Sequence, residues 1–109
     1  MTRTAAFATA LLLITSTSAF AEDKRAEQGK KIFTEQAQPS CTICHTLEDA
    51  GATGAIGPNL DELKPSPKQV REAVRAGVGV MPGYEDSLSG DDIEAVAYYV
   101  ATVTGNAGE

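Results

Sequence analysis

The feature that most constrains this chain is the five-residue segment C-T-I-C-H at residues 41–45. On one helical turn, residues i and i+3 lie on the same face, so both thiols can reach one edge of a single planar group. The histidine after the second cysteine can then bind a metal at the centre of that group. C-x-x-C-H is the attachment pattern of covalent haem. The sequence therefore predicts one haem c, joined through Cys41 and Cys44, with His45 on the iron.

Three other interpretations of the cysteines explain less of the chain. A thioredoxin-like redox pair occurs near a βαβ pattern, and no strand pattern surrounds this segment. A structural zinc site needs four ligands, whereas Cys41, Cys44 and His45 are the only cysteines and histidine in the sequence. The third interpretation is an incidental pair of buried thiols. A disulfide between residues three apart would close only a very small loop and stabilise little.

Residues 1–21 are typical of a secretory signal peptide. Arg3 gives a basic start, residues 5–20 carry no charge, and their apolar centre lies at residues 11–14. Ala19-Phe20-Ala21 is a small-x-small cleavage site. A retained anchor would need about 20 apolar residues, more than this run offers. We therefore expect cleavage after Ala21, export to the periplasm, and a single domain of residues 22–109 without a membrane span.

The expected mature domain is acidic. Arg3 is the only charged residue of the first 21, so residues 22–109 carry 15 acidic and 8 basic side chains and a net charge of −7 before haem is counted. This charge is unfavourable for binding nucleic acid or anionic membranes and favours a partner with a basic docking surface. Glu85 and Asp86 are the expected docking residues, whereas Asp91 and Asp92 are expected to cap the last helix.

The spacing of apolar residues predicts an all-α domain of about four helices. Ser66 and Ser89 are expected to be N-caps of the third and fourth helices, and Gly77 and Gly105 to follow their last residues. Loops rich in glycine are expected at residues 49–57 and 77–83. The first two helices are expected at residues 23–36 and 41–47, the third between its cap Ser66 and Gly77, and the fourth between its cap Ser89 and Gly105.

The second axial ligand of the iron is expected to be Met81. The mature domain contains one histidine and, once Met1 has been removed, one methionine, so two histidine ligands are impossible within this chain. Pairing of methionine with histidine raises the reduction potential of a haem. Met81 lies 36 residues beyond His45 in a glycine-rich loop. The alternatives are that Met81 only fills space in the core, which leaves the iron open or bound by a lysine.

Four motifs and one aromatic residue together resemble class I c-type cytochromes of the small bacterial monohaem kind. The resemblance covers residues 22–104 and implies a compact cytochrome c fold around one covalently bound haem. It also implies that Gly29 and Phe33 of the first helix pack against Tyr99 of the last helix. The four motifs are G-K-K-I-F at 29–33, C-T-I-C-H at 41–45, G-P-N-L at 57–60 and M-P-G-Y at 81–84.

The same resemblance implies further site roles. The carbonyl of Pro58 would accept a hydrogen bond from the imidazole of His45, which orients the ring and tunes the iron. Tyr84 would pack against the haem, and electrons would leave through the exposed haem edge near the cysteines. Seven residues separate Phe33 from Cys41, more than in family members with the same first motif, so the end of the first helix stays open.

These observations predict a periplasmic carrier of single electrons between redox proteins, which acts as a monomer or in transient complexes. We expect no enzymatic activity and no catalytic residue. A dedicated electron-accepting subunit of a dehydrogenase is the first alternative, because it would need the same haem site. An open-iron sensor or small peroxidase is the second. It would need a vacant ligand position with polar groups beside it, and the chain has no second histidine.

Overall fold

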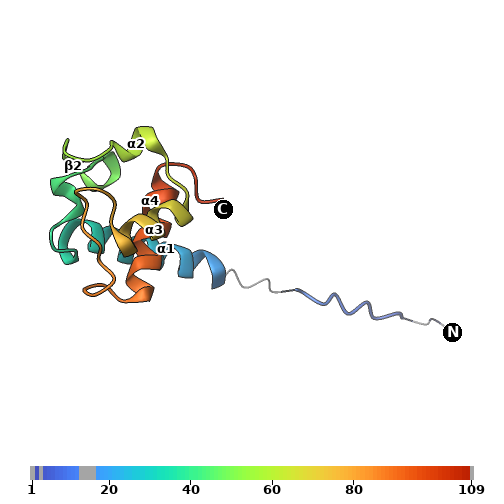
Figure 1. Cartoon of the computed structure of the whole chain (residues 1–109). Coiled ribbons are helices and arrows are strands. Elements are labelled where there is room, and N and C mark those ends of the chain that lie inside the picture. Colours follow the sequence, from blue (N-terminus) through green and yellow to red (C-terminus); the bar gives the residue numbers. More distant parts are fainter. Residues whose placement is uncertain (1, 3, 13–16, 109) are drawn as a thin grey trace.

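The computed structural model describes residues 2, 4–12 and 17–108 (Figure 1). Its four α-helices are α1 (Thr17–Lys31), α2 (Leu60–Leu63), α3 (Pro67–Ala76) and α4 (Gly90–Val103). A π-helical turn, η1 (Ile32–Gln36), continues α1, and two short 3-10 helices are η2 (Cys41–Ile43) and η3 (Glu48–Ala50). Strands β1 (Thr46–Leu47) and β2 (Ala52–Thr53) form an antiparallel pair in which Thr46 lies opposite Thr53.

Helix α4 forms the centre of the fold and packs against both α1 and α3. The Ser89 hydroxyl accepts a hydrogen bond from the backbone N–H of Asp92 at 3.0 Å, and the Asp92 carboxylate accepts one from the N–H of Ser89 at 3.3 Å. This reciprocal cap fixes where the helix begins. Its buried residues recur at helical spacing on faces turned toward α1 and α3: Ile93, Ala95, Val96, Ala97, Tyr99, Val100 and Ala101.

Helices α1 and α4 approach each other closely at Gly29. A Cβ atom at this position would collide with the carbonyl oxygen of Ala95 and with the Cβ of Tyr99. The ring of Phe33 meets that of Tyr99 edge-on, with centroids 6.1 Å apart and planes at 64°. The expected packing of the first helix against Tyr99 is therefore confirmed.

Helix α3 begins at its expected cap and is tied to α4 by an ion pair. Ser66 and Gln69 exchange hydrogen bonds between side chain and backbone at 2.9 and 3.2 Å. Nε of Arg71 donates to one carboxylate oxygen of Glu94 at 2.6 Å, and its Nη2 donates to the other at 3.1 Å. This paired geometry fixes the orientation of both side chains.

The expected helix at residues 41–47 is wrong beyond its first turn. Only Cys41–Ile43 is helical, as a 3-10 turn, and Thr46 and Leu47 leave the helix to pair with residues 52–53. β-Branched Thr46 favours a strand, and Gly51, with φ of +62°, allows the tight reversal between the strands. The fold is thus four α-helices with a small two-stranded sheet, and the all-α prediction needs that correction.

The start of α1 also differs from the prediction. The helix begins at Thr17 instead of about Asp23, so the expected cleavage site after Ala21 lies within its first turns. Alanine favours helix, and two alanines stand at 19 and 21. Residues 4–12 are exposed, have no regular secondary structure and lead away from the folded body (Figure 1). Met1, Arg3, Leu13 and Ile14 of the expected signal peptide lie outside the described residues.

No helix among the described residues combines the length and the apolar composition that a membrane crossing requires.

Candidate haem-binding site

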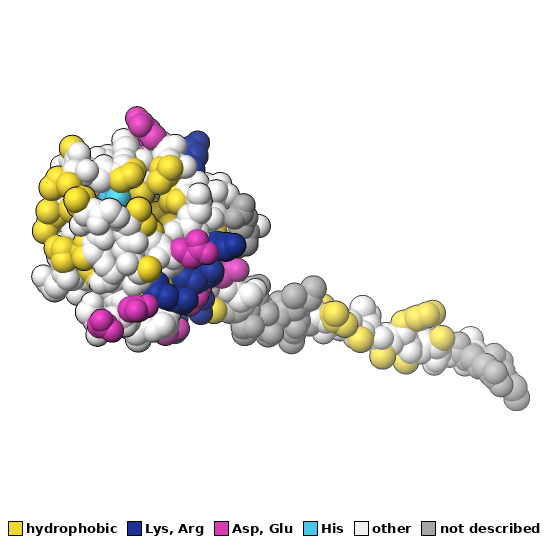
Figure 2. Space-filling view, viewed as in Figure 1, with side chains coloured by type: hydrophobic (Ala, Val, Ile, Leu, Met, Phe, Trp, Pro, Cys, Tyr) yellow, Lys and Arg dark blue, Asp and Glu magenta, His cyan; other side chains and the backbone are white. Residues whose placement is uncertain are grey.

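A cavity of about 520 Å³ opens on one face of the domain. Its volume lies within the range of small-molecule and cofactor sites. The floor and walls are mainly apolar, and Figure 2 shows apolar side chains gathered around the imidazole of His45. The apolar lining comes from η1, α2, α3 and α4, and includes Phe33, Leu60, Val70, Val74, Val96 and Val100.

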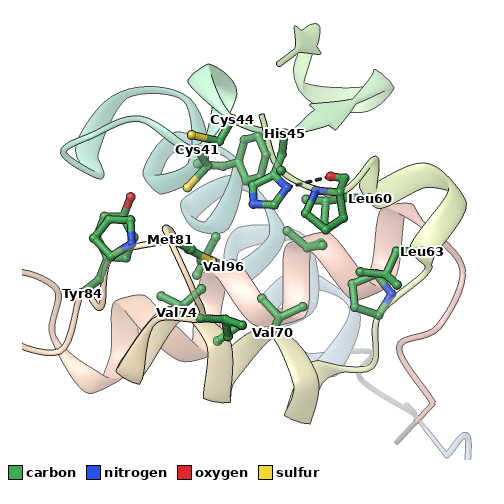
Figure 3. Close-up of a pocket in the computed structure, with 18 of the residues that line it drawn as sticks. Cys41, Cys44, His45, Leu60, Leu63, Val70, Val74, Met81, Tyr84 and Val96 are labelled. Carbon is green, nitrogen blue, oxygen red and sulfur yellow. Dashed lines mark hydrogen bonds between the residues drawn. The ribbon is translucent and has the colours of Figure 1, made fainter. Parts of the chain in front are cut away.

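All six residues proposed for the site from the sequence line this one cavity. Figure 3 shows His45 and the two cysteines along the upper side of the cavity, with Met81 and Val74 below them. The structure thus brings together side chains from three separate stretches of the sequence. The six are Cys41, Cys44, His45, Pro58, Met81 and Tyr84.

The cysteines and His45 are positioned by a single capped turn. The hydroxyl of Ser40 accepts a hydrogen bond from the N–H of Thr42 at 3.3 Å and so begins η2. The carbonyl of Cys41 accepts hydrogen bonds from the N–H groups of Cys44, at 3.3 Å, and His45, at 3.0 Å. Both cysteines are free thiols in this structure. The 3-10 turn therefore does what the helix was expected to do, which is to direct both thiols and the imidazole toward one cavity.

Burial, opposed in part by a backbone hydrogen bond and aided by the nearby Cys44, raises the pKa of the Cys41 thiol to about 11. A redox-active C-x-x-C pair instead has a lowered thiol pKa, because the thiolate is the nucleophile. This electrostatic environment is therefore unfavourable for thioredoxin-like chemistry at Cys41.

His45 is oriented by a backbone acceptor. Its Nδ1 lies 2.7 Å from the carbonyl oxygen of Pro58, and because a carbonyl can only accept, Nδ1 carries the proton. The lone pair is then on Nε2, where a metal can bind. Gly57 makes the arrangement possible, because a Cβ atom there would lie 2.8 Å from Cε1 of His45. The N–H of Gly57 also donates to the carbonyl of Cys44 at 2.7 Å.

Met81 reaches the cavity from a tight turn. Val78 and Met81 exchange two backbone hydrogen bonds, from the N–H of Val78 to the carbonyl of Met81 at 3.1 Å and in reverse at 2.9 Å. Gly79 lies between them with φ of +56°, a conformation that favours glycine. The expectation of an irregular glycine-rich loop at residues 77–83 is confirmed.

Tyr84, three residues after Met81 in the sequence, lines the same cavity and is 5% exposed. Its hydroxyl donates a hydrogen bond to the carbonyl of Pro39 at 2.7 Å, and its N–H donates to the carbonyl of Val74 in α3 at 2.8 Å. Burial raises the pKa of the phenol, with smaller contributions from Cys41 and Cys44. Tyr84 therefore remains a neutral donor.

Part of the lining was not expected from the sequence. Helix α2 supplies Leu60 and Leu63, and the segment that follows supplies Pro65. One signal was available, because Asn59 caps α2 by accepting hydrogen bonds from the N–H groups of Asp61 and Glu62 at 2.9 and 3.4 Å. Asparagine is among the preferred N-cap residues, so Asn59 before a leucine could have indicated this helix.

The residues of the cavity fit a haem. Two thiols and an imidazole with its metal-binding nitrogen free lie on one side, a thioether approaches from another loop, and the remaining walls are apolar. Apolar walls suit the porphyrin, and imidazole with thioether is a known pair of haem ligands.

Comparison with known proteins agrees with this chemistry. The family model described as cytochrome c oxidase, cbb3-type, subunit III matches residues 24–100. A cytochrome c-551 from Halorhodospira halophila is 30% identical over 77 residues, which are 69% of this chain and 99% of that protein. The crystal structure of the c-type cytochrome SorU from Sinorhizobium meliloti is similar with a TM-score of 0.73 and 49% identity, covering 80% of this chain and 99% of SorU.

Proposed function

The chain belongs to the cytochrome c family described by the cbb3-type subunit III model, and from this premise we propose that it is a periplasmic single-electron carrier with His45 and Met81 as axial ligands. It is a small monohaem class I c-type cytochrome that carries electrons, and its cofactor is a covalently bound haem c. The observation that most supports the proposed ligands is that His45 and Met81 line one cavity together with both cysteines.

Attachment is assigned to Cys41 and Cys44. Each thiol would form one thioether to the haem, which matches the C-x-x-C-H pattern. Both side chains lie at the cavity and neither is in a disulfide. Because they stand on one short turn that begins at Ser40, they would hold the same edge of the cofactor.

His45 is assigned as one iron ligand through Nε2. The hydrogen bond from Nδ1 to the carbonyl of Pro58 fixes both the tautomer and the plane of the ring. Such a bond also makes the imidazole a stronger donor to a metal. Pro58 is thus assigned the role of orienting the ligand without touching the metal.

Met81 is assigned as the other iron ligand, and Tyr84 is assigned to pack against the cofactor. When bound, the haem supplies a one-electron couple between ferrous and ferric iron. The chain's own contribution is to hold both ligands in fixed positions and to exclude water with apolar walls. Fixed ligands mean that little has to rearrange when an electron arrives or leaves.

Open-iron chemistry is disfavoured by the composition of the cavity. Among the described residues that line it, none is an aspartate, glutamate, lysine or arginine. A peroxidase needs a positioned acid or base beside the iron, and His45 is already committed to its hydrogen bond with Pro58. These observations support a carrier over an enzyme or a gas sensor.

Exposure of the reduced protein to carbon monoxide tests the proposal. We expect the reduced-minus-oxidised spectrum to be nearly unchanged by carbon monoxide, because His45 and Met81 would both hold the iron and leave no free position. A large and immediate spectral change in the native protein would instead support open iron.

Export and partner choice form a separate part of the proposal. The pattern of residues 1–21 supports secretion to the periplasm, with Glu22 as the first residue of the mature protein. The mass of the protein purified from the periplasm tests this directly. A free shuttle and a dedicated dehydrogenase subunit share the same haem site, and a pull-down from periplasmic extract separates them: the dehydrogenase subunit would stay bound to one enzyme.

A further inference from the structure

A hydrogen bond joins the Met81 loop to the segment that carries the cysteines. The hydroxyl of Tyr84, three residues beyond Met81, donates to the carbonyl of Pro39 at 2.7 Å. Pro39 stands two residues before Cys41, and 45 positions separate the two bonded residues. Both line the haem cavity. The bond therefore connects the loop of the proposed axial methionine with the attachment turn.

Both ends of this bond are held firmly. On one side, the N–H of Tyr84 donates to the carbonyl of Val74 in α3 at 2.8 Å, and the ring is 5% exposed. On the other side, the hydroxyl of Ser40, next to Pro39, lies 3.1 Å from the carbonyl oxygen of Phe33 and caps the turn of the cysteines. The acceptor and the donor are thus each fixed to a helix.

The chain between Met81 and Tyr84 is short and has little conformational freedom. Only Pro82 and Gly83 lie between them, and the ring of proline fixes its φ. At the start of the loop, a Cβ atom on Gly77 would lie 2.5 Å from the carbonyl oxygen of Met81 and 2.7 Å from the nitrogen of Gly83. With the chain packed this closely, movement of Met81 away from the cavity would pull on Tyr84.

We propose that Tyr84 is a positioning residue for Met81, whose hydroxyl latches the ligand loop to Pro39 and opposes dissociation of the thioether from the iron. The inference rests on the proposed ligation of the iron by Met81 and extends it to a residue that does not bind the metal. Loss of the latch leaves both thioethers and His45 in place, so it raises only the fraction of molecules in which Met81 has left the iron.

Replacement of Tyr84 by phenylalanine tests the latch, because it removes the hydroxyl and keeps the ring. Carbon monoxide binds reduced iron only after Met81 has left, so its apparent affinity increases with the fraction of open molecules. Loss of one hydrogen bond of ordinary strength changes such an equilibrium about fivefold. We therefore expect Tyr84→Phe to bind carbon monoxide about fivefold more tightly than the native holoprotein.

Tyr99→Phe is the matched control. The hydroxyl of Tyr99 donates to the carboxylate of Asp49 at 2.5 Å, and its side chain is 2% exposed. Tyr99 is not among the described residues that line the haem cavity. Its variant should unfold at lower denaturant concentration while its affinity for carbon monoxide stays at the native value.

The outcomes separate the latch from the ligation that it serves. The latch is refuted if Tyr84→Phe binds carbon monoxide like the native protein, if Tyr99→Phe increases the affinity equally, or if Tyr84→Phe gives no holoprotein. If the native protein already binds carbon monoxide as tightly as Met81→Ala does, the ligation by Met81 itself has failed.

Discussion

The close approach of α1 and α4 at Gly29 gives a quantitative prediction about stability. Alanine at this position would place a Cβ atom against the carbonyl of Ala95 and the Cβ of Tyr99, both fixed in the buried core of α4. Neither neighbour can turn aside as a flexible side chain would. Overpacking of this kind costs typically about 1–3 kcal/mol, and fixed neighbours place this case near 3 kcal/mol.

Helix propensity offsets part of this cost. Alanine is favoured over glycine within a helix by about 1 kcal/mol, so Gly29→Ala should lower the free energy of unfolding by about 2 kcal/mol. For a guanidinium m-value of about 3 kcal/mol per molar, the midpoint should fall by about 0.7 M. Unfolding of the ferric holoprotein, followed by far-UV circular dichroism, measures this shift. The thioethers should keep the haem attached, so the variant should remain coloured.

Gly90→Ala is the control for this experiment. Gly90 is the first residue of α4, and a Cβ atom there would meet nothing within 4 Å. Replacement of glycine in a compatible conformation stabilises by about 0.4–1 kcal/mol, so this midpoint should rise slightly. If both variants shift in the same direction by the same amount, or if Gly29→Ala does not shift, the close helix contact is refuted.

Three further predictions concern charges and titration. Glu94→Gln should lower the free energy of unfolding by about 0.5 kcal/mol, because it breaks the paired contact with Arg71. Glu72→Gln should leave the free energy of unfolding unchanged, because the contact between Glu72 and Lys68 is 4.0 Å long and exposed. Burial first, and then a hydrogen bond to a carboxylate, raise the pKa of Tyr99 above 10. As the pH rises, the unfolded chain therefore loses the Tyr99 proton before the folded chain does, and the free energy of unfolding should fall above about pH 10. Chemical denaturation at several pH values measures this fall, which should be smaller in Tyr99→Phe. The second-order rate of electron transfer with a basic partner should fall as salt shortens the Debye length from about 10 Å at 0.1 M to about 3 Å at 1 M. If this rate does not change with salt concentration in either the native protein or Glu85→Gln, the acidic charge has no role in docking.

The parts of the site that the sequence predicted are those encoded locally. The spacing of Cys41, Cys44 and His45 fixes one turn, and the caps at Ser66 and Ser89 are signals within four residues of the helix start. These predictions do not depend on the rest of the chain. Met81 could be singled out because residues 22–109 contain no other methionine.

What the sequence did not reveal depends on contacts between distant residues or on very short elements. A 3-10 turn and an α-helical turn place Cys41 and Cys44 on the same side, so the pattern could not show that the helix stops before Thr46. Helix α2 has four residues, which is too few for a periodic pattern. The bond from Tyr84 to Pro39 joins residues 45 apart, and nothing in either local sequence indicates it.

The reduction potential and spectrum of Met81→Ala test the central claim most directly. A thioether favours ferrous iron, so its removal should lower the potential, abolish the weak far-red absorption of the bond between methionine and ferric iron, and let carbon monoxide bind the reduced protein rapidly. Haem should remain on the chain, because Cys41 and Cys44 are untouched. A Met81→Ala protein with the native potential, the native far-red absorption and no reaction with carbon monoxide would contradict the assignment of His45 and Met81 as the two ligands of the electron-carrying iron.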